Sequence, residues 1–471
     1  MSQVLMPEHA ATPGLTDLAA LRVALRGTVL TPDDPEYAKA TAAWCAGVRH
    51  TPSLVVLPET AADVATAVGF ARDHGLPVAV QATGHGAAKP CDRGLLINTS
   101  RMQGVTIDPV AGTAQVEAGT KWSSVIPIAQ EHGLAPLNGS SSDIGVVGYT
   151  LGGGTGWMAR KYGFAADRLL SADLVTADGT ALHISETEND ELLWALRGGS
   201  GNFGIVTALE FELVPVAQVY GGGVVYPLVQ APTVLPAFAA WVETLPDEIT
   251  ASVAIMRLPP IPDLPPMLRG QEVVIVRACG VGDLTAAATA IAPMRKLGTP
   301  LLDTFTVMPY TAIDAISMDP VDPMPMLSAT SLLEELSPSA IDALLAVAGS
   351  GVDSPVMMIE LRYIAGASER SPRSGGTANR DTAPFTLYAI GVAGDPEGRS
   401  VVQAGLDRVI TQMAPFASGK VFLNFLGDGD WGPERTRAAY TEDDYARLQR
   451  IKAQVDPENR FCFNHNIQPA G

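Results

Sequence analysis

Three glycine-rich segments in the first half of the chain have the residues best suited to bind a phosphate-bearing ligand. They read TGHG at 83–86, GYTLGGGTG at 148–156 and GSGNFG at 199–204, and each lies next to a strand-like stretch. Because glycine has no side chain, such loops expose backbone amides, which can bind a pyrophosphate without basic side chains. The segments therefore predict a phosphate-bearing cofactor, with tight turns that bind nothing as the alternative.

The segment at 199–204 satisfies the GxGxxG pattern of dinucleotide-binding folds, but its neighbours stand in the wrong order. That fold requires a strand before the glycines and a helix after them. Here residues 186–197 are typical of a helix, and residues 205–213 alternate as in a half-buried strand. We therefore reject a classical Rossmann domain.

The elements that must position these loops begin with a βαβ unit at residues 54–80. Thr60 is placed to cap the helix of this unit, and Gly75 can adopt the left-handed backbone conformation that ends it. From about residue 216 the pattern changes to longer β-like runs, which indicates a second domain. The other predicted elements are strands at 94–97, 105–116 (with a turn at 108–112), 273–278, 385–390 and 421–425, helices at 283–294 and from Thr441, and a loop at 370–380.

The composition favours a packed protein and excludes several kinds of partner. Of the 471 residues 47% are apolar and 17% are charged, which excludes disorder as the main state. A net charge of -19 argues against nucleic acid and anionic membranes as partners. The chain shows neither a membrane-spanning run nor an export signal, so we expect a cytoplasmic protein. The spacing of its four cysteines and seven histidines indicates neither a disulfide framework nor a metal site.

The motifs together resemble the berberine-bridge-enzyme type of FAD-linked oxidase, in the vanillyl-alcohol-oxidase and para-cresol-methylhydroxylase (PCMH) superfamily. The resemblance covers nearly all of residues 50–215 and 420–471, through PSLVVLPETAADV, LPVAVQATGHG, INTSRM, VEAGTKW, GYTLGGGTGW, YGFAAD, VTADG, RGGSGNFGIVT and DPENRFCFNHNIQP. It implies an α+β fold. A two-part FAD-binding domain of the PCMH type would comprise residues 1–214 and 415–471, and a substrate-binding domain of antiparallel sheet plus helices would comprise residues 215–414.

The resemblance also implies a covalent flavin. His85 corresponds to the histidine that bonds to the flavin 8α-methyl group, which would raise the flavin's reduction potential. Many relatives add a cysteine link, but Ser141 stands at that position, so we expect attachment through His85 alone and a packing role for Cys91. The further cofactor contacts implied are Thr83, Gly84, Gly86, Ser141, Ile144, Gly145, Gly148, Gly152, Gly153, Gly201, Gly204, Ile205, Val206, Asn424, Asn464 and Asn466.

In the family that the chain resembles, a catalytic base often lies in a strand of the substrate-binding domain. Glu360 aligns with that position, so the resemblance makes it the main catalytic candidate. Burial beside the flavin would raise its pKa towards the working pH. The alternative is an ion pair with Arg362. Tyr149, Tyr363 and Tyr388 are candidates to line the substrate cavity, or else they pack in the core. Some relatives use a tyrosine pair instead, but Thr155 and Phe422 occupy those positions in this chain.

The activity implied is oxidation of a C–OH or related C–H bond in a small sugar, alcohol or natural-product intermediate. Hydride would pass to the flavin, and O2 would reoxidise it. Ile144 stands where relatives with open oxygen access tend to carry a smaller side chain. A dehydrogenase with another acceptor is therefore an alternative, as is a flavin-binding protein with little turnover. We expect a monomer or a homodimer.

Overall fold

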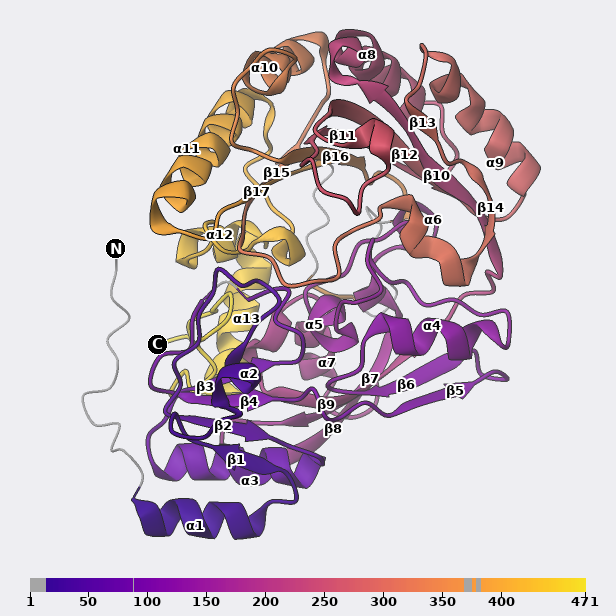
Figure 1. The fold of residues 1–471 in the computed structure, drawn as a ribbon. Helices are drawn as coiled ribbons and strands as arrows, with labels where there is room; N and C mark the ends of the chain where they lie inside the picture. The colour runs from indigo at the N-terminus through magenta and orange to yellow at the C-terminus, as the bar shows by residue number, and fades with distance from the viewer. Residues whose placement is uncertain (1–13, 88, 368–374, 378–382) are drawn as a thin grey trace.

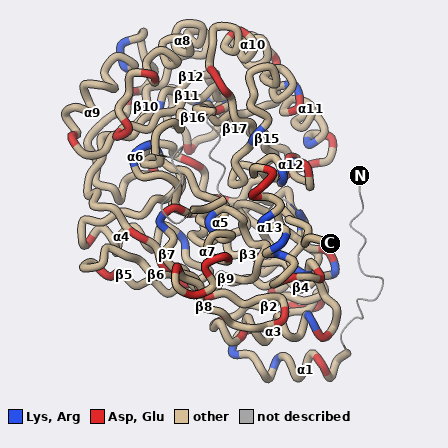
Figure 2. Tube along the Cα trace, turned by 180° about the vertical axis from the view of Figure 1, so that it is seen from behind, with Lys and Arg blue, Asp and Glu red and all other residues tan. Residues whose placement is uncertain are grey.

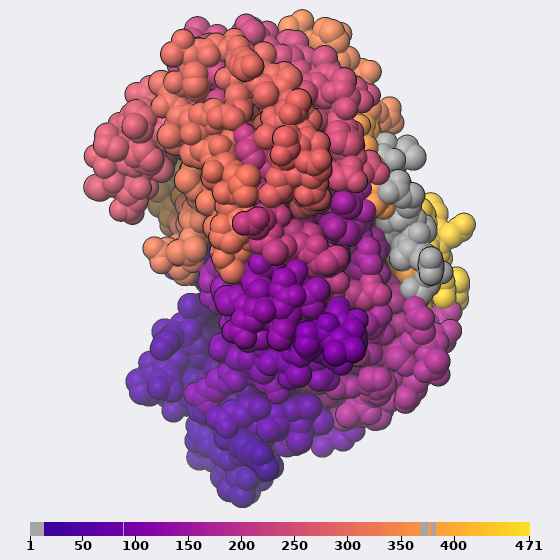
Figure 3. All heavy atoms as spheres, turned by 90° about the vertical axis from the view of Figure 1, so that its right-hand side faces the viewer, coloured from indigo at the N-terminus to yellow at the C-terminus, as the bar shows by residue number. Residues whose placement is uncertain are grey.

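The described residues form three β-sheets with helices packed around them, so the predicted α+β class is confirmed (Figure 1). The computed structural model describes residues 14–87, 89–367, 375–377 and 383–471. The predicted loop at 370–380 lies largely outside the described residues. Two sheets make up the lower part of the molecule in Figure 1 and the third makes up the upper part. In the space-filling view of Figure 3 the middle of the chain rests on the N-terminal part.

A four-stranded sheet contains the predicted βαβ unit. Its order is β1 (Thr28–Leu30), β2 (Leu54–Leu57), β4 (Leu95–Asn98), β3 (Val78–Gln81), with β2 and β3 both parallel to β4. Thr60 caps helix α3 (Ala61–Asp73) by accepting a hydrogen bond from the Asp63 amide, and Gly75 has a φ of 65°, so both local predictions are confirmed. Helices α1 (Leu15–Ala24) and α2 (Tyr37–Thr41) precede β1 and β2 respectively.

A five-stranded antiparallel sheet forms the second layer. Its order is β5 (Val105–Asp108), β6 (Thr113–Glu117), β9 (Ile205–Glu212), β7 (Leu169–Val175), β8 (Ala181–Ser185). Its apolar core includes residues of helices α4 (Trp122–Gln130), α5 (Val146–Leu151), α7 (Asp190–Leu196) and α13 (Glu442–Val455). The short helix α6 (Ala159–Tyr162) follows α5. The final helix predicted from Thr441 is present as α13, and the structure shows that Thr441 caps it. Tyr445, Leu448 and Ile451 are buried in the core, so the C-terminal segment packs against the N-terminal part of the chain.

The eight-stranded antiparallel sheet is built from the middle of the chain. Its order is β13 (Leu302–Asp303), β10 (Gln218–Pro227), β12 (Glu272–Gly280), β11 (Ile249–Arg257), β16 (Met358–Tyr363), β17 (Phe385–Val392), β15 (Met326–Leu333), and β14 (Thr306–Pro309) pairs with β10. The helices packed on it are α8 (Ala231–Val242), α9 (Leu284–Ile291), α10 (Pro338–Ala348) and α11 (Pro396–Met413). Helix α9 ends before the predicted Met294, because Pro293 has no amide to continue it.

The two faces of this sheet differ in polarity, and the difference creates the site. Side chains alternate between faces along a strand. Leu361 and Tyr363 of β16 lie in the apolar core under the helices. Glu360 and Arg362 of the same strand therefore point to the opposite face, where Arg362 reaches Ser140 of the lower part. A polar sheet face thus meets the segment that carries the central glycine cluster.

The predicted strand at 421–425 is wrong. Residues Leu423–Phe425 form one turn of 3-10 helix, and α12 (Pro433–Ala438) follows. Phe422 packs edge-on against Phe164, and Asn424 bonds to the glycine-rich loop. These long-range contacts outweigh the local strand preference of the segment.

Basic and acidic residues occur along both the upper and the lower part of the chain (Figure 2). None of the described helices has the length and apolar content that a membrane span requires.

Candidate active site

The polar face of the eight-stranded sheet holds a buried cluster centred on Glu360. Its Oε1 accepts a hydrogen bond from Ser252 Oγ at 2.8 Å and lies 3.4 Å from Arg277 Nη1. Its Oε2 accepts from Arg362 Nε at 2.7 Å. The carboxylate is therefore satisfied on both oxygens, and its side chain is only 2% exposed, whereas that of Arg362 is 14% exposed.

The expected rise in the Glu360 pKa is wrong. Burial by itself opposes the charged form, as expected, but Arg362 and Arg277 together outweigh it and hold the pKa of Glu360 below its usual range. Glu360 is consequently a carboxylate at neutral pH. The Glu360–Arg362 ion pair that the sequence left as an alternative is present, and Arg277 extends it to three charged groups.

Tyr388 lies beside Glu360, and Tyr363 does not. Tyr388 of β17 is paired with Glu360 across the strands, and its ring is centred 4.7 Å from that of Phe425. Burial raises its pKa to about 12, so the hydroxyl is neutral. Tyr363 packs on the helix-covered face, against Phe385 and under the Arg160 guanidinium, because odd-numbered residues of β16 face that way.

The glycine-rich loop after α5 is tied to Asn424. Asn424 Oδ1 accepts from the Gly154 amide at 2.9 Å, and Nδ2 donates to the Tyr149 carbonyl at 3.0 Å. A Cβ added at Gly152 would lie 2.7 Å from Asn424 Nδ2, so this close approach requires glycine. The Tyr149 hydroxyl is buried, has no hydrogen-bond partner among the described residues, and has a strongly raised pKa because of that burial.

Arg362 connects the two halves of the site. Its guanidinium lies 5.4 Å from the ring centre of Phe425 and 5.9 Å from that of Trp157, which follows the glycine-rich loop. Stacking of this kind favours a cation held close to aromatic faces. The glycine-rich loop, the segment at 422–425 and the Glu360 cluster are therefore neighbours in space.

His85 lies in the loop after β3, with its ring held on two sides. The ring stacks on Trp44, with centroids 4.2 Å apart and planes 14° apart, and Nδ1 lies 3.0 Å from Thr83 Oγ1. Burial lowers the pKa of His85 to about 4, while the nearby charges of Asp143 and Lys121 act in opposite directions. The imidazole is therefore neutral near pH 7. Gly145 approaches the same loop, since a Cβ there would lie 3.7 Å from Thr83.

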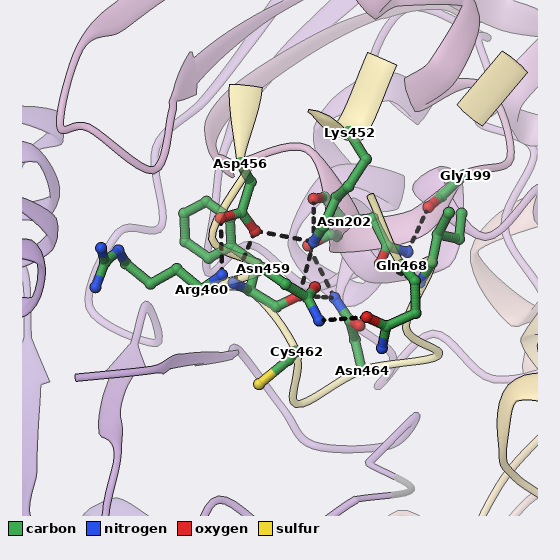
Figure 4. A network of polar contacts seen from close by, with 12 residues as sticks. Gly199, Asn202, Lys452, Asp456, Asn459, Arg460, Cys462, Asn464 and Gln468 are labelled. Carbon is green, nitrogen blue, oxygen red and sulfur yellow. Dashed lines mark hydrogen bonds and ion pairs between the residues drawn. The ribbon is translucent and has the colours of Figure 1, made fainter. Parts of the chain in front are cut away.

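The loop at 199–204 is joined to the C-terminal tail (Figure 4). Asn464 Nδ2 donates to the Gly201 carbonyl at 3.0 Å, and Asn202 Nδ2 donates to the His465 carbonyl at 3.1 Å. Gly204 has a φ of 154° and packs against Leu174, where a Cβ would lie 2.7 Å away. Ile205 and Val206, which follow it on β9, are buried.

Several contributors to the site were not identified from the sequence. Trp44, Ser252 and Arg277 lie far along the chain from their partners His85 and Glu360, and carry no motif. Cys91 lies fully buried in a small apolar cluster, in line with its predicted packing role. Within the described part of the chain, no group of three or more His, Cys, Asp or Glu side chains is arranged to hold a metal ion.

Two family models match the chain at the segments that form this site. The FAD binding domain model matches residues 52–185, and the berberine and berberine-like model matches residues 421–468. The first includes the His85 loop and the central glycine cluster, and the second includes Asn424 and Asn464. The chain belongs to the berberine-bridge-enzyme-like FAD-linked oxidoreductases.

Known members of this oxidoreductase family match over nearly the whole chain. The (R)-6-hydroxynicotine oxidase of Paenarthrobacter nicotinovorans is 28% identical over 96% of this chain and 99% of its own. The crystal structure of 6-hydroxy-D-nicotine oxidase from Arthrobacter nicotinovorans has a TM-score of 0.80 at 26% identity, over 95% of this chain and 98% of its own. Xylooligosaccharide oxidase from Myceliophthora thermophila has the same fold, with a TM-score of 0.82 at 23% identity over 97% and 99% of the two chains.

The surroundings of the glycine loops fit an FAD in this oxidoreductase. Asn464 Oδ1 and Asn466 Oδ1 are buried and have no hydrogen-bond partner among the described residues, so each is free to bond to a ligand. At Gly86 and Gly148 a Cβ would meet no described atom within 4 Å, which leaves the backbone open to close approach. Ser141 is buried and accepts a hydrogen bond from the Asp143 amide, while Ile144 is partly buried.

Proposed function

We propose that the protein is an oxidase that removes a hydride from a C–OH or related C–H bond of a small organic substrate, with an FAD attached through His85 and with O2 as the electron acceptor. The observation that carries this proposal is the buried Glu360–Arg362 pair, set directly against the segment that leads into the glycine-rich loop. A named relative that acts on 6-hydroxynicotine supports the substrate size and the oxidase activity.

We assign the following roles to residues of the chain. The loops at 83–86 and 152–156, with Asn424, Asn464 and Asn466, would hold the FAD, which when bound accepts a hydride from the substrate carbon. Glu360, held ionised by its two arginines, is the proposed proton acceptor for the substrate hydroxyl. The neutral Tyr388 and Tyr149 would line the substrate cavity. In this proposal residues 1–214 and 415–471 bind the FAD and residues 215–414 bind the substrate.

Attachment through His85 alone rests on two side chains. The neutral His85 ring carries a nitrogen able to form a bond, and Ser141 offers no thiol for a second link. Purified protein should keep its flavin through acid precipitation, and His85→Ala should release it. Peptide mass spectrometry should find one flavin-histidine peptide, and a flavin-cysteine peptide would contradict the single link.

Anaerobic mixing with a panel of sugars, aromatic alcohols and hydroxylated heterocycles tests the activity itself. Bleaching of the flavin absorbance by one class identifies the substrate, and readmitted air should restore the colour with formation of hydrogen peroxide. If no substrate class bleaches the flavin, the result would favour a flavin-binding protein with little turnover.

The location in the cytoplasm and the monomeric or dimeric state of the protein stay predictions.

A dehydrogenase is the second candidate, because the partly buried Ile144 stands at the position associated with oxygen access. Reoxidation of the reduced protein by O2 and by an artificial acceptor, compared by stopped-flow, separates the two. Faster oxygen reaction in Ile144→Ala than in the wild type would favour the dehydrogenase.

A further inference from the structure

Arg160 of α6 is buried and bonds to the backbone of the sheet that carries Glu360. Its side chain is only 4% exposed. Its Nε donates a hydrogen bond to the Ala365 carbonyl at 2.9 Å, just beyond the end of β16. Its two Nη groups donate to three carbonyls at or just before the start of β11, those of Leu245 at 3.2 Å, Pro246 at 2.9 Å and Ile249 at 2.6 Å. One side chain therefore holds the ends of two neighbouring strands.

These two strands carry most of the Glu360 cluster. Strand β11 contains Ser252, β16 contains Glu360 and Arg362, and Ser252 is paired with Arg362 across the strands. Arg160 belongs to the other side of the site, in the short helix that follows the glycine-rich loop. We propose that Arg160 fixes the position of the Glu360 strand relative to that loop, and that it is therefore a positioning residue for the reaction. The inference rests on the proposed function, because it assumes that Glu360 accepts the substrate proton beside a flavin that the loop holds.

Two further contacts hold the same segments together. The ring of Trp157, which shortly precedes Arg160, is centred 5.9 Å from the Arg362 guanidinium. Gly366 has a φ of 110°, and a Cβ there would lie 2.8 Å from the Arg160 carbonyl oxygen. The turn after β16 therefore approaches the backbone of α6 too closely for any residue with a side chain. The guanidinium bonds thus strengthen a contact that the backbone itself makes.

Arginine suits this position better than lysine. Its planar guanidinium presents five N–H donors in a fixed fork, and carbonyl oxygens accept from such donors. The Arg160 guanidinium also lies 4.7 Å from the ring centre of Tyr363, and its Nη2 lies 3.5 Å from Asp247 Oδ1. These contacts offset part of the cost of burying a charge. A lysine ammonium has three donors on a single nitrogen, so it would keep only part of these bonds.

Arg160→Met tests the positioning role, because it removes the hydrogen bonds but keeps an unbranched side chain. It should lower the limiting rate of anaerobic flavin reduction by about tenfold or more, since a misplacement of about 1 Å can slow a reaction by about 10²-fold. Arg160→Lys should give an intermediate rate. Lys161→Met is the matched control from the same helix, because Lys161 is 30% exposed and pairs with Glu248 at 3.5 Å. Its rate should stay within about twofold of the wild type, as expected for a surface ion pair.

Amide hydrogen exchange measures the positioning without a substrate. Exchange at residues 249–257 and 358–363 should be faster in Arg160→Met than in Lys161→Met. The limiting rate is compared well below the thermal midpoint of each protein, so that lower stability alone does not reduce it. If exchange or the midpoint changes while the limiting rate stays within about threefold of the wild type, Arg160 has a structural role only and the inference is wrong. A raised KM at an unchanged limiting rate would also overturn it.

Glu360→Gln separates a failure of this inference from a failure of the proposed function. If Glu360→Gln is slow and Arg160→Met has the wild-type rate, only the inference about Arg160 falls. If Glu360→Gln also has the wild-type rate, the proposed role of Glu360 is wrong and the inference falls with it. Should Arg160→Met not fold, Arg160→Lys takes its place, and a wild-type limiting rate in Arg160→Lys would then overturn the inference.

Discussion

The Lys452 ammonium lies 2.9 Å from the Asp456 carboxylate, and neither side chain is exposed. The two residues stand one helical turn apart at the end of α13. Lys452 Nζ also donates to the carbonyls of Asn202 at 2.8 Å and Phe461 at 3.0 Å. Asp456 accepts from the Phe461 amide at 2.9 Å. This pair therefore joins the last helix to the loop at 199–204 and to the C-terminal tail (Figure 4).

Lys452→Met should destabilise the protein by about 3–5 kcal/mol, because it leaves the buried Asp456 carboxylate without its cationic partner. Urea unfolding measures the free energy of unfolding. Loss of flavin from the folded protein would show that the loop at 199–204 has loosened. Adding Asp456→Asn removes the unpaired charge while keeping an amide acceptor, so the double variant should recover part of the loss. A single variant within about 1 kcal/mol of the wild type would contradict this prediction.

Truncation after Asp456 should remove both cofactor and stability, since Asn464 and Asn466 are lost together with the contacts of Phe461 to Lys452. Truncation after Gln468 is the control, because it keeps those residues. Flavin content per protein and the thermal midpoint are the measurements. A protein ending at Asp456 that kept its flavin spectrum and midpoint would show that the tail does not bind the cofactor.

Glu360→Gln should slow anaerobic flavin reduction by about 10²–10⁴-fold if Glu360 accepts the substrate proton. The limiting rate at saturating substrate is measured by stopped-flow. A residue that only binds substrate would raise KM without lowering this rate, and a purely structural ion pair would lower the thermal midpoint instead. A change below about threefold would remove Glu360 from the mechanism and turn attention to Tyr388 and Tyr149.

His465 should make the protein less stable in mild acid. Burial lowers its pKa to about 4 in the folded chain, whereas an unfolded histidine has a pKa of about 6.5. Between these values only the unfolded state binds the proton, so this contribution to stability is present above about pH 6.5 and is lost as pH falls towards 4. The slope is about 1.4 kcal/mol per pH unit. Urea unfolding between pH 7 and 5 should show that the free energy of unfolding falls less steeply in His465→Gln than in the wild type. If the free energies of the two proteins fall in parallel, His465 does not cause this pH dependence.

The sequence by itself determined the elements that depend on neighbouring residues. Thr60 and Thr441 cap their helices, and Gly75 ends one, because each acts on backbone groups within a few positions along the chain. The order of helix, glycines and strand around residues 199–204 could also be predicted, because it too depends on residues that are close together along the chain. The family motifs likewise lie in continuous stretches, which is why the FAD-binding segments could be recognised before the structure was known.

Only the tertiary structure decided how these pieces act on one another. Residues 421–425 have a strand-like sequence, yet Asn424 bonds to Gly154 and Tyr149, and Leu423–Phe425 form a turn of 3-10 helix. Glu360 was placed on its strand correctly, but the direction of its pKa shift depends on Arg277, which comes from another strand 83 positions earlier. Trp44 is likewise distant from His85 along the chain, yet the two rings stack in the folded protein. Electrostatic and packing contacts depend on distance in space, and sequence patterns report only distance along the chain.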